Sequence, residues 1–395
     1  MKRDIHRAKA MERYAAGTWR RHSTRALFFI GGFGTASWAP LVPLLRERLA
    51  IGEDVLGMLL LCIGIGSLVT MPLSGAATAR FGCRKVLTVA GICFPALLLA
   101  LSKVSFIPVA VPILLAFGAV MGCIDVAVNI QAVLVEKAAG RRLMSNMHSM
   151  WSIGGFAGAG LFGVWVGTLG LTPFASTVAA GLIMLAILAV FSRHLLPYGD
   201  EGGGALVAIP KGIVVFVGVV AFISFLAEGA IMDWSGVFLT TVRGYDIALA
   251  GTGFTVFSAA MLTMRLLGDR TVQRLGQKLV AAGGSLLSFA GFLLVIFSEG
   301  RLPLYMGFFL IGVGSANIVP VFYSLLGRQT AMPIGTAVSA VSSMGYLGVL
   351  MGPAAIGFLA SRTSLYASFG FLAALMLLQT AVALHVHRSL RNAVD

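Results

Sequence analysis

Twelve apolar segments, each about as long as a bilayer is thick, follow one another along this chain of 395 residues. An α-helix rises about 1.5 Å per residue, so about 20 apolar residues cross the hydrocarbon core. The membrane interior offers no water to unpaired backbone groups, and a span of this length must therefore be helical. The sequence predicts an all-α integral membrane protein with spans at approximately 25–49, 54–79, 86–104, 107–134, 144–169, 172–195, 212–240, 247–270, 279–298, 302–328, 334–361 and 365–386.

The connections between these segments are short, with one exception. Residues 196–211 are polar and rich in Gly and Pro, and they divide the segments into two sets of six. Short connections force neighbouring helices to run antiparallel. We therefore predict two six-helix bundles joined by a linker, with a tail at 1–24, bundles at 25–195 and 212–386, the linker at 196–211 and a second tail at 387–395.

Basic residues are distributed unequally between the two sides of the segments. If the N-terminus is cytoplasmic, 22 of the 29 Lys and Arg lie on the cytoplasmic side, six lie in outer loops, and Arg265 lies inside a segment. The positive-inside rule then assigns both termini and the linker to the cytoplasm, as in a bacterial inner-membrane protein. The net charge of +14 therefore reflects membrane topology, and the absence of a basic face or binding motif argues against nucleic acid as a partner.

The two sets of segments repeat each other. Arg80–Arg84 matches Arg274–Lys278, and Ser149–Gly154 matches Ser343–Gly348, both at an offset of 194 residues. Two matches at one offset indicate a duplicated six-helix unit. Many secondary transporters are built in this way, with the substrate site near the middle of the membrane between the halves.

The loop after the second segment reads Gly75-Ala-Ala-Thr-Ala79-Arg80-Phe-Gly82-Cys-Arg84-Lys85. It resembles the G-x-x-x-D-R-x-G-x-R-K signature of the major facilitator superfamily, with Ala79 where the family has Asp and Gln273 at the equivalent place in the second half. The resemblance covers essentially the whole chain and implies two pseudo-symmetric bundles. It also implies a charged latch on the cytoplasmic side, whose members here would be Arg80, Gly82, Arg84, Arg265, Asp269 and Arg274.

Within the superfamily the sequence is most similar to the fucose-permease-like group and its bacterial relatives, which include rhizopine (inosamine) permease-like proteins. Gly122-Cys-Ile-Asp125-Val-Ala-Val-Asn129 resembles the E-x-x-x-N element of fucose permeases, whose acid takes part in proton coupling. The resemblance implies that Asp125 takes the place of that acid.

The residues of the fourth segment support a functional role for this element. Gly118, Gly122, Asp125 and Asn129 are spaced four, three and four apart and share one helical face. An acid inside a membrane is unfavourable by about 2.5–3.5 kcal/mol and normally faces an interior. We expect this face to line a water-filled cavity, with Asp125 carrying a proton and Asn129 contacting substrate. The alternative is a structural hydrogen bond to a neighbouring helix.

The seventh segment contains two acids, Glu228 and Asp233. Five residues of helix rotate by about 500°, which leaves the two side chains about 140° apart. Only one of them can face a central cavity, and Glu228 lies nearer the middle of the membrane. We expect Glu228 to contact substrate or a proton, whereas Asp233 is either an outer gate or a structural partner.

Aromatic and polar residues elsewhere complete the candidate site. Trp38 and Trp234 are expected to stack on a sugar-like ring or to close an outer gate, with an aromatic belt as the alternative. Ser342 and Tyr346 share one face of the eleventh segment and are expected to line the cavity. Asn317 precedes Pro320, where a kink would free backbone carbonyls for substrate. His148 is expected to gate or relay protons, with a packing role as the alternative.

Nothing in the sequence matches an enzyme. We find no nucleotide-binding loop, no nucleophile elbow, no cluster of metal ligands and no CxxC pair. We therefore expect no metal and no cofactor other than a proton gradient. The sequence predicts a monomeric secondary transporter in a lipid bilayer that takes up a small polar solute (a sugar, cyclitol or amino-cyclitol) by proton symport. The alternatives are a proton-antiport exporter of a metabolite or drug, and a membrane sensor or scaffold that has lost transport.

Overall fold

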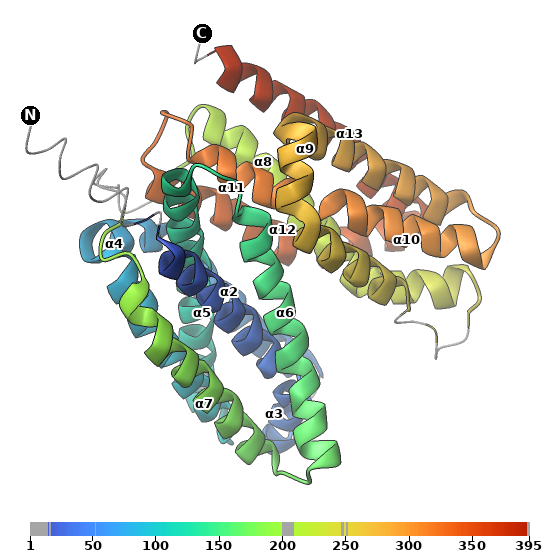
Figure 1. Ribbon diagram of the computed structural model, residues 1–395. Helices are drawn as coiled ribbons and strands as arrows, with labels where there is room; N and C mark the ends of the chain where they lie inside the picture. Colours follow the sequence, from blue (N-terminus) through green and yellow to red (C-terminus); the bar gives the residue numbers. More distant parts are fainter. Residues whose placement is uncertain are drawn as a thin grey trace, which may run out of the picture. The chain divides into compact units, whose positions relative to one another are not determined.

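The computed structural model describes Ala15, residues 17–51, 53–199, 209–245, Leu249 and residues 252–392. All regular structure in this part of the chain is helical, so the predicted all-α fold is confirmed (Figure 1). Most of the predicted tail at 1–24, the centre of the linker at 200–208 and the last three residues lie outside the described residues.

Nine helices in the described part of the chain are long and apolar enough to cross a membrane. Two of them, α4 (Glu53–Leu101) and α9 (Thr252–Phe297), each consist of two consecutive helices joined at a bend. Each therefore covers two predicted segments. The first predicted segment is formed by α2 (Thr18–Trp38) and α3 (Leu41–Leu49). Together these helices account for the twelve predicted segments.

The bends in α4 and α9 lie at equivalent glycines. Gly82 has φ 81° and ψ 151°, and Gly276 has φ 80° and ψ 155°. This region of backbone space is essentially restricted to glycine. The glycine of the predicted signature therefore reverses the chain between two antiparallel spans, and its copy does the same in the second half.

The chain divides into two compact units. Unit 1 comprises Met1–Leu143, Met147–Ile209 and Pro333–Ser339, and unit 2 comprises Met144–Asn146, Pro210–Met332 and Ala340–Asp395. The remaining helices of unit 1 are α5 (Ile107–Ala139), most of α6 (Met144–Gly163) and α7 (Pro173–Phe191). Those of unit 2 are α8 (Ile213–Val237), α10 (Arg301–Ser315), α11 (Ile318–Leu326), most of α12 (Ile334–Arg362) and α13 (Leu365–Asn392).

Close helix packing in unit 1 depends on small residues. A β-carbon at Gly118 would collide with the carbonyl of Ile63, and one at Gly122 would press on Ser67, so α5 lies directly against α4. The Ser67 hydroxyl donates to the Gly118 carbonyl at 2.7 Å across this contact. Small residues at membrane helix contacts allow backbones to approach in this way.

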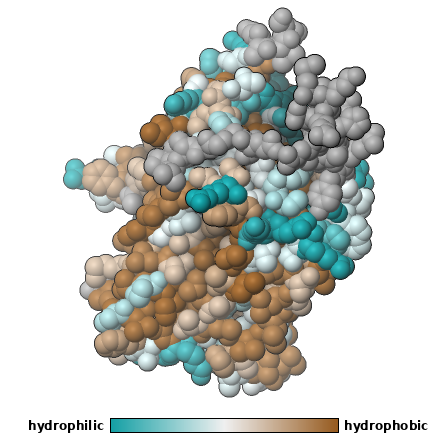
Figure 2. All heavy atoms as spheres, turned by 90° about the vertical axis from the view of Figure 1, so that its left-hand side faces the viewer, coloured by the Kyte–Doolittle hydropathy of each residue, from teal (hydrophilic) through white to brown (hydrophobic). Residues whose placement is uncertain are grey.

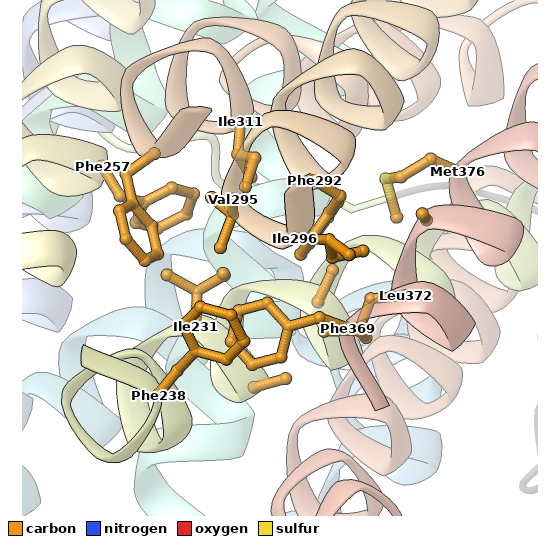
Figure 3. Packing of buried hydrophobic residues seen from close by; sticks show 14 of the residues in the cluster. Ile231, Phe238, Phe257, Phe292, Val295, Ile296, Ile311, Phe369, Leu372 and Met376 are labelled. Atoms are coloured by element: carbon orange, nitrogen blue, oxygen red, sulfur yellow. The ribbon is translucent and has the colours of Figure 1, made fainter. Parts of the chain in front are cut away.

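Unit 2 is held together by an aromatic core. Phe238 and Phe369 stack with ring centroids 4.5 Å apart, and Phe292 meets Phe369 edge-on at 6.2 Å. Figure 3 shows these rings converging with Phe257 and aliphatic side chains from several helices. Each of these four phenylalanines is buried, and offset and edge-on ring pairs add to the stabilisation that burial gives.

One arginine in each unit binds the C-terminal end of the third span of its half. The Arg48 guanidinium donates to the carbonyl of Leu101 at 2.6 Å and to that of Val104 at 3.2 Å. Arg243 donates to the carbonyls of Val295 at 2.7 Å and Ile296 at 2.8 Å. Leu101 and Val295 are separated by the same 194 residues as the repeated motifs. These arginines therefore cap the negative end of a helix, where a cation is stabilising.

The start of the linker packs onto the signature loop of unit 1. Arg84 donates its backbone N–H to the Leu196 carbonyl at 2.7 Å, and its side chain donates to the Leu195 carbonyl at 3.1 Å. The Gln131 side chain accepts from the N–H of Leu196 at 3.1 Å. A β-carbon at Gly82 would collide with the Pro197 carbonyl, whereas nothing lies within 4 Å of the equivalent atom at Gly276. Gly82 thus serves both the bend and the docking of the linker.

Candidate functional site

The centre of the candidate site is an ion pair inside unit 2. Glu228 on α8 places Oε2 3.6 Å from Nη2 of Arg265 on α9. The Arg265 side chain is 10% exposed and that of Glu228 is 35% exposed. Arginine keeps its charge in proteins and requires a partner when buried. Glu228 thus combines a buried cationic partner with partial accessibility, which suits an acid that exchanges partners.

Arg265 also binds a break in the tenth segment. Helix α10 ends at Ser315 and α11 begins at Ile318, and Pro320 in the first turn of α11 has no N–H to continue the helical bonding. The Arg265 Nε donates to the Ala316 carbonyl at 3.2 Å, and the Asn317 amide donates to the Met264 carbonyl at 2.9 Å. Adjacent residues of α9 therefore hold both residues of the break.

The sequence predicted that Asn317 would face substrate at a kink that frees carbonyls. The break is present, but one of its carbonyls is taken by Arg265, and Asn317 is buried. A β-carbon at Gly268 would collide with the Asn317 side chain. The lack of a side chain at Gly268 therefore allows Asn317 to pack against α9. In this conformation Asn317 joins the break to α9, and it does not offer its amide to a cavity.

Asp269, one turn after Arg265, binds the start of α6. Its carboxylate accepts the backbone N–H groups of Ser145 at 3.1 Å and Asn146 at 3.3 Å, which belong to unit 2. A carboxylate at a helix N-terminus satisfies free N–H groups and is favoured by the helix dipole. The sequence grouped Arg265 with Asp269 as a latch. The structure places Arg265 against Glu228 and Asp269 against the start of α6, although the two residues lie one turn apart on the same face of α9.

The acid and amide of the fourth segment lie together in unit 1. The Asn129 amide donates to the backbone carbonyl of Asp125 at 2.9 Å and to its Oδ1 at 3.4 Å. Asn129 is buried and Asp125 is half-buried. The glycines expected on a cavity wall, Gly118 and Gly122, instead contact α4. The cavity-wall interpretation is therefore wrong for these two glycines. The Asn129 amide bonds to Asp125 and does not extend into a cavity in this conformation.

Comparison with known proteins identifies the family. The model of the Major Facilitator Superfamily matches residues 217–392. An uncharacterised MFS-type transporter of Yersinia pestis is 46% identical over 372 residues, covering 93% of this chain and 95% of the relative. This chain belongs to the major facilitator superfamily.

Two further comparisons agree with membership in the superfamily. Membrane protein MosC of Rhizobium meliloti is 30% identical over 345 residues, covering 86% of this chain and 83% of MosC. The solved structure of the Escherichia coli fucose:proton symporter FucP matches with a TM-score of 0.76 at 15% identity, covering 93% of this chain and 98% of that chain. The latter shows a shared fold. The predicted family is confirmed, and the protein is a multi-pass membrane transporter.

The tryptophans and Asp233 of this superfamily member differ in exposure. Trp38 is buried and packs against Phe117 with ring centroids 5.8 Å apart, so it is not available to stack on a ligand in this conformation. Trp234 is half-buried, and a β-carbon at Gly357 would touch its ring. Asp233 is exposed. Of the expected gate residues on α8, Asp233 is therefore the accessible one.

The remaining candidates are mostly enclosed. Ser342 is buried, and its hydroxyl lies 2.6 Å from that of Tyr323 on α11, so it joins α12 to α11 and does not line a cavity. Tyr346 is half-buried one turn further along α12. His148 is half-buried and its ring centroid lies 5.1 Å from that of Phe28 on α2, which corresponds to the packing alternative.

The other basic residues of the superfamily signature are exposed. Arg80 and Arg274 lie at the ends of equivalent helices, beside the two bends. The Arg80 guanidinium carbon lies 5.2 Å from the centre of the Phe81 ring. Arg84, by contrast, is half-buried against the start of the linker. The basic residues of the signature are thus divided in this chain between exposed cations and Arg84, which docks the linker.

A buried polar cluster that the sequence did not predict lies one turn from Glu228. The Gln379 amide donates to Ser224 Oγ at 2.7 Å and to the Val220 carbonyl at 3.1 Å, and its oxygen accepts from Ser285 at 3.1 Å. This cluster fixes α8 against α13 and α9. A glutamine inside an apolar segment was the available signal. Among the described residues no group of three or more His, Cys, Asp or Glu could hold a metal ion.

Proposed function

We propose that this transporter takes up a small polar solute by proton symport across a bacterial inner membrane, working as a monomer driven by the proton gradient. Glu228 is the central residue of the proposal. The observation that carries it is the ion pair of a partly accessible Glu228 with a buried Arg265 that also binds the break in the tenth segment.

The chemistry of the pair links protonation to helix contacts. Ionised Glu228 attracts Arg265 across α8 and α9, and protonation removes that attraction. Arg265 then keeps its bond to the Ala316 carbonyl, while Glu228 becomes free to bond a solute. A group that changes both its charge and its helix partner is able to bias a conformational equilibrium.

The proposed solute is a sugar, cyclitol or amino-cyclitol. A carboxylic acid and its carboxylate both bond hydroxyl groups, and the carboxylate also binds an amine. Asp125, held by Asn129, provides a second acid in unit 1. The fold shared with a fucose:proton symporter is consistent with this class, and the distribution of Lys and Arg supports cytoplasmic termini.

A ligand screen identifies the solute. Binding to the folded state raises stability by mass action, so sugars, cyclitols and amino-cyclitols are compared by the thermal unfolding of purified protein. The proposal expects stabilisation by one of these classes. Stabilisation only by apolar drugs would contradict it.

The direction of transport is tested with the ligand found in this screen. Right-side-out membrane vesicles with an imposed external acid pulse are expected to accumulate the solute. Accumulation only in everted vesicles with an acidic lumen, where protons leave as the solute enters, would show antiport and overturn the proposal.

A further inference from the structure

An apolar groove runs along the outer surface of unit 1, between α4 and α5. Its volume is about 470 Å³. Its wall includes Thr70, Phe81, Lys85, Val89, Cys93 and Cys123, and Lys85 is its one charged residue. None of the residues that line it is acidic.

The groove is on a surface that faces lipid. Phe81 is 49% exposed and Val89 is 61% exposed, although both are large and apolar. Figure 2 shows hydrophobic residues gathered over the lower part of the face on this side of the molecule, with a few hydrophilic residues among them. In a membrane protein such a face is covered by acyl chains, and a polar solute has no partner along it.

The stretch of groove wall from Lys85 to Cys93 is slightly shorter than one leaflet is thick. Eight residues separate Lys85 from Cys93 on the part of α4 that follows the bend, which is about 12 Å of rise. One half of the hydrocarbon core is about 15 Å thick. Lys85 lies just after the bend at Gly82 and Cys93 lies towards the middle of the membrane.

Positive charge is concentrated at the bend end of the groove. Lys85 lines it and is exposed. Arg80 is exposed as well, and its guanidinium carbon is 5.2 Å from the ring of Phe81, another residue of the wall. Two cations at the membrane edge above an apolar groove fit a phosphate joined to an acyl chain.

We propose that the groove binds one acyl chain of an anionic glycerophospholipid of the cytoplasmic leaflet, with its phosphate between Lys85 and Arg80. The assignment to the cytoplasmic leaflet rests on the orientation proposed above. The site is separate from the Glu228–Arg265 pair, so it concerns a lipid ligand and not the transported solute. A free phosphate ion would contact the cations but would leave the apolar wall of the groove uncovered.

Native mass spectrometry of the purified protein tests headgroup selectivity. The wild type is expected to retain phosphatidylglycerol in preference to phosphatidylcholine, and Lys85→Gln is expected to weaken retention about fivefold, whereas Lys85→Arg retains it. Lys278→Gln removes a cation beside the equivalent bend of unit 2 and serves as the matched control. Equal retention of the two lipids by the wild type, or an equal loss in Lys85→Gln and Lys278→Gln, would overturn the proposal. Displacement by glycerol phosphate alone would also overturn it.

Native cysteines locate the lipid. Cys93 lines the groove, whereas Cys62 lies elsewhere on α4 and is similarly half-buried. In variants that keep only one of them, phosphatidylglycerol added to detergent-solubilised protein is expected to slow N-ethylmaleimide labelling of Cys93 and to leave Cys62 unchanged. Equal effects on both cysteines, or none on Cys93, would place the lipid outside this groove. This readout does not depend on transport, so its failure is distinct from a failure of the proposed symport.

Discussion

Glu228 and Arg265 connect α8 to α9 through a contact of 3.6 Å between Oε2 and Nη2. Arg265 is the more enclosed partner and donates a second bond to the Ala316 carbonyl at the break between α10 and α11. A single cation therefore joins three helices of unit 2.

The coupling between Glu228 and Arg265 is measurable as an interaction energy. We expect Arg265→Gln to destabilise the protein more than Glu228→Gln, because Arg265 also binds Ala316 and is more deeply buried. A double-mutant cycle on thermal unfolding in detergent is expected to give an interaction energy of about 0.5–3 kcal/mol. The matched control is a cycle of Asp233→Asn with Arg265→Gln, since Asp233 is an exposed acid on the same helix. Equal interaction energies in the two cycles would contradict a specific pair.

The two bends are expected to respond differently to the same substitution. Gly82→Ala and Gly276→Ala both introduce a side chain at a backbone conformation that is unfavourable by about 1–3 kcal/mol for other residues. Gly82→Ala also collides with the Pro197 carbonyl, while the space around Gly276 is open. We therefore expect a larger loss of thermal stability for Gly82→Ala. An equal loss would show that the linker does not dock at this glycine.

Linker docking also has a proteolytic readout. Gly82→Ala is expected to increase the rate at which a protease cuts between residues 195 and 211, because the backbone bonds of Leu196 and Tyr198 to the signature loop are displaced. Gly276→Ala is the control. Unchanged cleavage in both variants would argue that the start of the linker is held by other contacts.

The outer arginines are expected to contribute to stability in both halves. Hydrogen bonds to a charged group are worth about 1.5–3 kcal/mol, so Arg48→Gln and Arg243→Gln are each expected to destabilise the protein measurably. Arg46→Gln tests the specificity of the effect, since Arg46 is an exposed neighbour whose side chain donates to the Ile51 carbonyl at 3.4 Å. A loss for Arg46→Gln as large as that for Arg48→Gln would exclude helix capping as the cause.

Much of the fold was predictable from hydropathy and the repeat. Apolar length determines where spans lie, and two matches at one offset indicated a duplicated unit. The structure adds that Gly82 and Gly276, the glycines of the repeated motif, share one backbone geometry. The site was less predictable. Helical periodicity places Gly118, Gly122 and Asp125 on one face, but it does not tell whether a cavity or another helix meets that face. The structure shows α4 against the two glycines.

The partner of Glu228 was hidden for a related reason. Its pairing with Arg265 depends on the rotation and the vertical register of α8 and α9, which no local pattern encodes. Ser342 was expected to face a cavity because it shares a polar stripe with Tyr346. It is buried because the Tyr323 hydroxyl on the facing helix α11 satisfies it. Polar stripes in membrane helices therefore predict polar contacts more securely than they predict water.

The central claim is that protonation of Glu228 couples solute movement to the proton gradient. We would measure solute uptake by right-side-out vesicles that contain wild type, Glu228→Gln or the control Glu299→Gln, both as pH-driven accumulation and as exchange of labelled for unlabelled solute. Glu299 is an exposed acid outside the helices. Gln keeps the size and hydrogen bonds of a protonated Glu but cannot release a proton. We predict that Glu228→Gln loses accumulation and keeps exchange, while Glu299→Gln keeps accumulation. Accumulation by Glu228→Gln at the wild-type level and with the wild-type pH dependence would contradict it.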